Sequence, residues 1–289
     1  MSLNFLSQIR QAISNLNPQE VHELADRPFS IGIVAASPEV SWEIESFLCP
    51  PHLSMAKRAE VSSMIHRVAL APSGASDLEI YDPSFRVPKG AFLFDREDPR
   101  RTVRAILRKR PDMALPLARH FLPFREPASL QIVHRISREN AFFSLATALP
   151  DIMPSLLSIP WAVGEFASDT AFITMNQIRM GFLLAAAADR DLGYREQKGE
   201  VASIIAGAFG WRALARELVG KIPMGGGLLP KAAVAYAGTY VEGISLERLY
   251  RLGAGLTREE RRSAYAEALD RGKRIAGNVM EMMRRRPAV

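Results

Sequence analysis

The residues with the clearest chemical potential follow the first apolar run of the chain. Residues 29–35 form a β-branched, apolar segment, and a short turn and a helical pattern come after it. A phosphate-binding loop is found in this setting, with the pattern Gly-x-x-x-x-Gly-Lys-Ser/Thr, because its glycines let backbone N–H groups surround the phosphates. Here the four defining positions hold Ala36, Ser41, Trp42 and Glu43. We therefore predict a P-loop-like strand–turn–helix that is degenerate and lacks its phosphate loop.

The charges that follow this turn also disfavour a polyphosphate. Ser37 and Pro38 have the character of an N-cap and a first helical turn, and Glu39, Glu43 and Glu45 come next. Acidic side chains near a helix N-terminus satisfy its partial positive charge from within the chain. We expect repulsion of a nucleotide at this point.

Two aspartates stand at the ends of predicted strands and leave two interpretations open. Asp82 lies in the segment YDPSF, and Asp95 ends the segment GAFLFD. Carboxylates at strand ends can bind magnesium, but aspartate also caps turns and helices. We prefer the capping interpretation for both residues.

Other catalytic patterns are missing from the sequence. It contains no Asn-Lys-x-Asp, His-Glu-x-x-His or Gly-x-Ser-x-Gly element, and its five histidines are isolated from one another. We expect a non-enzymatic protein with no cofactor and no metal. The alternative is a nucleotide (GTP)-dependent enzyme, or a GTPase-linked regulator, that uses an atypical site.

A second set of polar residues interrupts the apolar helical stretches of the C-terminal half. Buried polar groups need partners, because an unpaired buried charge costs several kcal/mol. We suggest that Arg179 pairs with Asp169 or Glu217. The bundle either places these groups at its rim or rests on, or partly in, a bilayer. The candidate structural or interaction residues in these helices are Asp169, Asn176, Gln177, Arg179, Arg212, Arg216 and Glu217.

The glycines Gly225, Gly226 and Gly227 complete the candidate set. They could open a helix N-terminus toward an anion. Between Pro223 and Pro230, however, three glycines more often make a tight turn between two helices, which is the interpretation that we prefer.

Rows of small residues indicate how the helices pack. Ala235, Thr239 and Gly243 are spaced by four, as are Gly181 and Ala185. Small side chains on one face let helix backbones approach closely. We expect closely packed helices in this half of the chain.

The order of the elements predicts an α+β fold that is mostly α. The segments 64–70, 77–81 and 90–95 are short, apolar or alternating, and predict strands in addition to the strand at 29–35. Long helical patterns follow at about 128–149, 166–189, 197–220 and 229–251. A last helix begins with the capping box at Thr257 and Glu260. We predict a small N-terminal α/β region and a C-terminal all-helical bundle of antiparallel hairpins.

Four segments follow from these patterns. We predict N-terminal amphipathic helices in residues 1–27, a small degenerate α/β domain in residues 28–125, a helical domain in residues 126–255 and a basic helix in residues 256–289.

Residues 128–253 resemble the YcjF-like family, a bacterial helical domain of unknown function. The similarity rests on Gln177 and Met180, the Pro223/glycine-rich turn and the small-residue helix at 232–243. The resemblance implies a helical domain that is often membrane-associated and sometimes attached to a GTPase, without active-site residues to carry over. The chain departs from the membrane members in having no obvious spanning segment before this domain. The preceding region is similar to a shortened GTPase domain without its nucleotide contacts.

The charge distribution points to an anionic partner or to a solvated basic face. The formal net charge is +6, and residues 96–125 contain nine basic against three acidic residues. We expect a protein partner or self-association and allow peripheral contact with an anionic membrane, whereas a nucleic acid is not expected. The single cysteine, Cys49, fits a reducing compartment. We expect a cytoplasmic protein, in part at the inner membrane surface.

Overall fold

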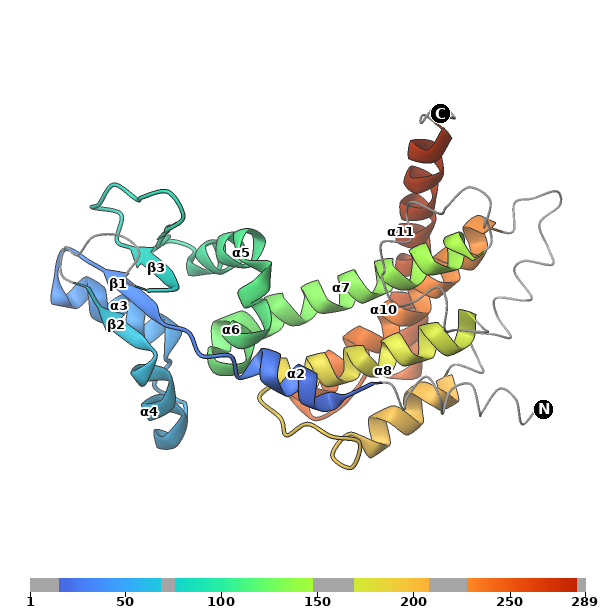
Figure 1. Ribbon diagram of the computed structural model, residues 1–289, viewed down its shortest axis with the longest axis horizontal. Coiled ribbons are helices and arrows are strands. Elements are labelled where there is room, and N and C mark those ends of the chain that lie inside the picture. Colours follow the sequence, from blue (N-terminus) through green and yellow to red (C-terminus); the bar gives the residue numbers. More distant parts are fainter. Residues whose placement is uncertain (1–15, 69–75, 148–168, 208–227, 285–289) are drawn as a thin grey trace. The chain divides into compact units, whose positions relative to one another are not determined.

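The structure of the protein is a computed structural model that describes residues 16–68, 76–147, 169–207 and 228–284 (Figure 1). The chain divides into two compact units. We call residues 20–129 with 186–190 the sheet unit, and the described part of the rest the helical unit.

The sheet unit is built on four parallel strands. These are β1 (Ile31–Val34), β2 (Ile65–Arg67), β3 (Leu78–Tyr81) and β4 (Phe92–Leu93), in the order β2-β1-β3-β4. All residues of β1 and β3 are buried, as expected for the central strands of a parallel sheet. All four predicted strands are confirmed, with shorter bounds.

Helices α2 (Pro18–Ala25), α3 (Pro38–Leu48) and α4 (Met55–Ser63) occupy the first part of this region. The Ser37 hydroxyl accepts a hydrogen bond from the Val40 N–H at 3.4 Å, so the predicted N-cap of α3 is confirmed. Next come α5 (Pro99–Lys109), the 3₁₀ turn η1 (Pro111–Met113) and α6 (Ala114–His120). Asp189, after α8, also belongs to this unit, and it pairs with Lys57 at 2.9 Å and with Arg125 at 3.2 Å.

The long helices are α7 (Leu122–Ala146), α8 (Asp169–Ala187), α10 (Leu228–Leu252) and α11 (Arg258–Arg284), and residues 198–207 are also helical. The start of α7 differs from the prediction of 128. The segment PFREP suggested a break, but Pro123 and Pro127 both fit within the early turns of the helix. Residues 208–220 of the helix predicted at 197–220 lie outside the described residues.

The capping box of α11 is confirmed. The Thr257 N–H donates to Glu260 Oε2 at 2.8 Å, and the Glu260 N–H donates to Thr257 Oγ1 at 3.3 Å. Hydrogen bonds from Arg248 and from Thr257 hold the pKa of the Glu260 carboxyl at about 2. This local pairing fixes where α11 begins.

The core of the helical unit joins α7, α10 and α11, through buried residues such as Leu145, Tyr236 and Ala276. The small residues on α10 allow close contact, as expected from their spacing. A Cβ atom at Gly243 would lie 2.7 Å from the Val133 methyl groups and 2.9 Å from the Met180 sulfur. The mostly-α α+β fold class is confirmed. Within the described residues, none of the helices combines the length and apolar character needed to cross a bilayer.

Candidate functional site

A buried hydrogen-bond network connects α7, α8 and α10. Asn140 Nδ2 donates to Thr239 Oγ1 at 2.8 Å, and Asn176 Nδ2 donates to Asn140 Oδ1 at 2.9 Å. Gln177 Nε2 also donates to Thr239 Oγ1, at 3.2 Å. All four side chains are buried. Because buried amides are costly without partners, this network favours one register of the three helices.

Glu139 links the network to the surface of α7. Its Oε2 accepts a hydrogen bond from Asn176 Nδ2 at 3.3 Å and lies 3.8 Å from Arg179 Nη1. Its Oε1 lies 3.9 Å from Arg135 Nε. The carboxylate of Glu139 therefore contacts the buried network, the exposed Arg135 and the half-buried Arg179.

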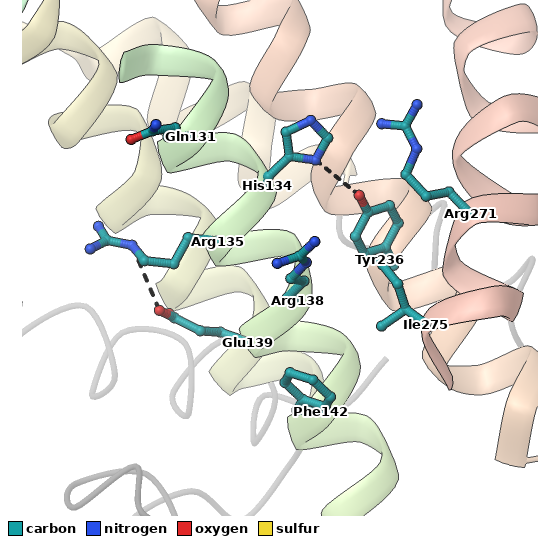
Figure 2. Close-up of a pocket in the computed structure, with 9 residues that line it drawn as sticks. All are labelled: Gln131, His134, Arg135, Arg138, Glu139, Phe142, Tyr236, Arg271 and Ile275. Carbon is teal, nitrogen blue, oxygen red and sulfur yellow. Dashed lines mark hydrogen bonds and ion pairs between the residues drawn. The ribbon is translucent and has the colours of Figure 1, made fainter. Parts of the chain in front are cut away.

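A pocket of about 670 Å³ lies beside this carboxylate, and residues of α7, α10 and α11 line it (Figure 2). Such a volume is within the usual range for small-molecule sites. The lining combines cations, polar groups and apolar side chains. Its members are Gln131, His134, Arg135, Arg138, Glu139, Phe142, Tyr236, Arg271 and Ile275.

Aromatic contacts organise one side of the pocket. His134 Nδ1 lies 3.1 Å from the Tyr236 hydroxyl, and the His134 ring is 5.1 Å from the Tyr240 ring. Tyr236 and Tyr240 are one helical turn apart, with nearly parallel rings. The Arg271 guanidinium lies over the Tyr240 ring at 5.3 Å from its centroid. This contact holds Arg271 at the pocket by a cation–π interaction.

Two arginines give the pocket its charge. Figure 2 shows Arg138 on α7 and Arg271 on α11, with the His134–Tyr236 pair near them. Within the described residues, neither Arg138 nor Arg271 forms an ion pair with a carboxylate. Arg271 instead interacts with Tyr236 and Tyr240.

The surroundings of His134 shift the pKa of its imidazole. Burial lowers its pKa below the ordinary value of 6.5, and the positive charges of Arg271 and Arg138 lower it further. Burial also raises the pKa of the Tyr236 hydroxyl. At neutral pH the pocket thus has a neutral imidazole and a protonated phenol beside permanent cations.

Gly272 brings α11 close enough for Arg271 to reach the tyrosines. A Cβ atom at this position would lie 2.9 Å from the Cα and the carbonyl oxygen of Ala233, and 3.1 Å from Tyr236 Cβ. Backbone atoms cannot give way as a flexible side chain can, so only glycine fits here.

The carboxyl ends of the strands form the other place where a ligand site was considered. β2 and β3 lie on opposite sides of β1, so the chain has a topological switch point between β1 and β3, where open α/β sheets usually bind ligands. Here Asp82 Oδ2 accepts a hydrogen bond from the Ala36 N–H at 3.1 Å. The Asp82 carboxylate is buried and accepts this hydrogen bond from the turn between β1 and α3.

The capping interpretation of both aspartates agrees with their contacts. Asp82 Oδ1 accepts from the Ser84 N–H at 3.2 Å, and Asp95 Oδ1 accepts from the N–H groups of Glu97 and Asp98 at 3.1 and 2.9 Å. In the described part of the chain, no three His, Cys, Asp or Glu side chains are grouped as metal ligands.

Only some of the candidate residues predicted from the sequence lie in the part of the chain that the structure describes. Asn176 and Gln177 meet in the buried network, and Arg179 contacts Glu139. Asp169 is the first residue of α8, and its side chain lies outside the described part. The pairing of Arg179 with Asp169 or Glu217 therefore stays a prediction. The remaining candidates lie outside the described residues: Arg212, Arg216, Glu217, Gly225, Gly226 and Gly227.

The pocket residues themselves were not predicted. His134 and Arg138 are four apart on α7, and Arg271 and Ile275 are four apart on α11, so each pair shares a helix face. This spacing was a signal in the sequence, but it did not indicate which faces meet.

Comparison with known proteins adds no relative. No protein-family model, no curated protein and no solved structure matches the chain.

Proposed function

We propose that the protein is a non-enzymatic binding protein whose helical unit receives an anionic group of a ligand or partner in the pocket between α7, α10 and α11. The observation that carries the proposal is the pair Arg138 and Arg271. They come from two helices and line one pocket without a carboxylate partner in the described residues.

Arginine suits this task because its planar guanidinium can donate two parallel hydrogen bonds to a carboxylate or a phosphate. The cation–π contact with Tyr240 restricts Arg271 before a ligand arrives, which reduces the entropy lost on binding. Phe142 and Ile275 add apolar surface to the lining. These features favour an anion that carries an apolar body, such as an aromatic phosphate or carboxylate.

The contacts in the pocket support binding more than catalysis. Glu139 is paired with Arg135 and Arg179. Among the described residues, the lining contains no serine, threonine or cysteine that His134 could activate. The resemblance of residues 128–253 to the YcjF-like family is consistent with this proposal, since it implies no active-site residues.

Calorimetry with phenyl phosphate tests the proposal on the full chain. We expect saturable binding, and we expect Arg138→Gln with Arg271→Gln to weaken it by roughly 100-fold, at about tenfold for the charge-assisted hydrogen bond of each arginine. Arg258→Gln with Arg262→Gln is the matched control, because these residues are exposed on α11 and lie outside the pocket lining. It should leave the affinity within about twofold.

Two results would overturn the proposal. One is the absence of binding heat with phenyl phosphate and with inorganic phosphate at millimolar concentration. The other is an equal loss of affinity in the pocket variant and in the α11 control, since that pattern reflects net charge alone. Circular dichroism on each variant confirms that it is folded.

A further inference from the structure

Helix α5 of the sheet unit is labelled in Figure 1. Its exposed residues include five cations and no acid. Arg100, Arg104 and Arg108 are spaced by four, so they lie in one row along the helix. Arg101 and Lys109 extend this exposed surface on the same helix. The five side chains make up what we call the α5 cationic face.

The orientation of α5 is fixed by its opposite side. Val103, Ile106 and Leu107 are buried in the sheet unit. The Thr102 hydroxyl accepts a hydrogen bond from the Asp95 N–H at 2.9 Å and donates to the Leu93 carbonyl at 3.0 Å. These contacts attach α5 to the end of β4. The cationic face therefore cannot turn inward without breaking the core.

Only part of this charge is balanced within the chain. Arg104 pairs with Asp98 at 2.9 Å, and Arg101 lies 3.4 Å from Asp98. In the described residues, Arg100 and Arg108 have no ion pair with a carboxylate. Lys109 lies over the Phe92 ring at 5.6 Å. Among the residues that the structure describes, three of the five cations thus have no acidic partner.

We propose that the α5 cationic face docks on the surface of a bilayer that contains anionic lipid. Lipid phosphates are distributed over a plane, and a row of exposed arginines along a helix can contact several of them at once. The apolar stems of arginine can lie against the membrane interface while their guanidinium groups meet the phosphates. This proposal is independent of the pocket in the helical unit. It involves other residues, and its partner is a membrane surface that presents many phosphates.

A nucleic acid is a weaker match to the same charges. The α5 sequence PRRTVRAILRK has no aromatic side chain on which a base could stack, and no asparagine or glutamine that could read a base edge. A lipid surface needs neither, because attraction to its anionic headgroups depends on charge and on closeness.

Vesicle co-sedimentation of the full chain tests this proposal. The vesicles contain about one-third phosphatidylglycerol in phosphatidylcholine, with pure phosphatidylcholine as the uncharged reference. We expect binding to the anionic vesicles alone, and release when the salt rises from about 50 mM to about 500 mM. The variant Arg100→Gln/Arg108→Gln/Lys109→Gln should bind roughly 100-fold more weakly, at about fivefold for each cation.

The matched control is Arg258→Gln/Arg262→Gln/Arg274→Gln. It removes the same charge from exposed positions on α11, where basic and acidic residues are mixed. Vesicle binding by this control should stay within about threefold of the parent chain. If the α5 triple variant does not fold, Arg108→Gln alone should lose about fivefold, and the charge-conserving Arg108→Lys should restore binding.

Each other outcome contradicts the proposal. Unchanged vesicle binding in the α5 variants would show that another surface is used, and an equal loss in the α11 control would show that only net charge matters. No association of the parent chain with anionic vesicles would exclude lipid docking. Binding of duplex DNA or RNA, lost in the α5 variants and without vesicle binding, would assign the face to nucleic acid instead.

Discussion

His134 has the environment of a group that stays neutral at physiological pH. It is half-buried, it faces the Tyr236 hydroxyl, and Arg138 and Arg271 stand nearby as like charges. These surroundings disfavour the imidazolium form. Stability linked to neutral His134 is therefore fully present above the ordinary pKa of 6.5. It is lost as the pH falls from there through the lowered pKa of the folded state.

We predict that NMR titration of the His134 ring has its midpoint below 6.5. Arg271→Gln removes a like charge from the pocket and should move this pKa upward. A bound phosphate should also move it upward, because an anion favours the imidazolium. Loss of the resonance in His134→Gln assigns it. A midpoint above 6.5, or no response to Arg271→Gln, would contradict this description of the pocket.

Asn140 is the centre of the buried network, because it donates to Thr239 and accepts from Asn176. We predict that Asn140→Ala lowers the free energy of unfolding by about 1–3 kcal/mol, since buried partners are left without a hydrogen bond. Urea denaturation measures the change. Asn278→Ala is the matched control, an exposed asparagine on α11, and it should change stability by less than about 0.5 kcal/mol. Equal effects in the two variants would argue against a stabilising network.

At the scale of whole elements, the pocket depends on how closely α10 and α11 approach. Gly272 faces the Ala233 backbone and Tyr236, so it sets the distance at which Arg271 reaches Tyr240. Gly277 is on the same helix, but a Cβ atom there would meet nothing within 4 Å. The two glycines thus lie on the same helix, but only Gly272 is packed against another helix.

We predict opposite effects of alanine at these two positions. Gly272→Ala should lower the free energy of unfolding by about 1–3 kcal/mol through overpacking, and should weaken phenyl phosphate binding. Gly277→Ala should raise the free energy of unfolding by about 0.5–1 kcal/mol, because alanine favours the helical conformation more than glycine does. Thermal and urea denaturation of both variants would test this. A neutral Gly272→Ala would show that α11 can move away from α10 at no cost.

At the scale of the whole molecule, the sheet unit is the part of the chain that would bind a nucleotide. A parallel sheet with a strand–turn–helix at its centre has the outline of a nucleotide-binding domain. However, Asp82 occupies the Ala36 N–H, and Ser37 caps α3. A polyphosphate at this point would lose these donors and meet the Asp82 carboxylate.

We predict that the variant Arg138→Gln/Arg271→Gln, whose pocket has lost its two cations, gives no binding heat with millimolar GTP or ATP in the presence of magnesium. The physical reason is repulsion between the phosphates and the carboxylates of Asp82 and Glu39 near the N-terminus of α3. Calorimetry measures it, with phenyl phosphate binding to the parent chain as the positive control. Saturable magnesium-dependent binding of GTP that is lost in Asp82→Ala would support a nucleotide-dependent function instead.

Local patterns were enough to predict the features that depend on neighbours in the chain. Short segments were enough to predict the caps at Ser37 and Thr257, because each cap bonds an N–H group three residues away. The four strands and the changed P-loop positions could also be read from short segments. The close packing at Gly243 also follows from its spacing with Ala235 and Thr239. The predicted start of α7 was too late. Pro127 lies near the N-terminus of the helix, where a proline disrupts fewer backbone hydrogen bonds than in the middle of a helix.

The pocket could be recognised only from the tertiary structure. His134 and Tyr236 are 102 residues apart in the chain, and their contact depends on which faces of α7 and α10 meet. The sequence by itself indicated that Asn176 and Gln177 need partners, whereas the packing of three helices supplied Asn140 and Thr239. Helix periodicity specifies which residues share a face, but the choice of the opposite face is a property of the assembled core, where volume and hydrogen bonding are satisfied together.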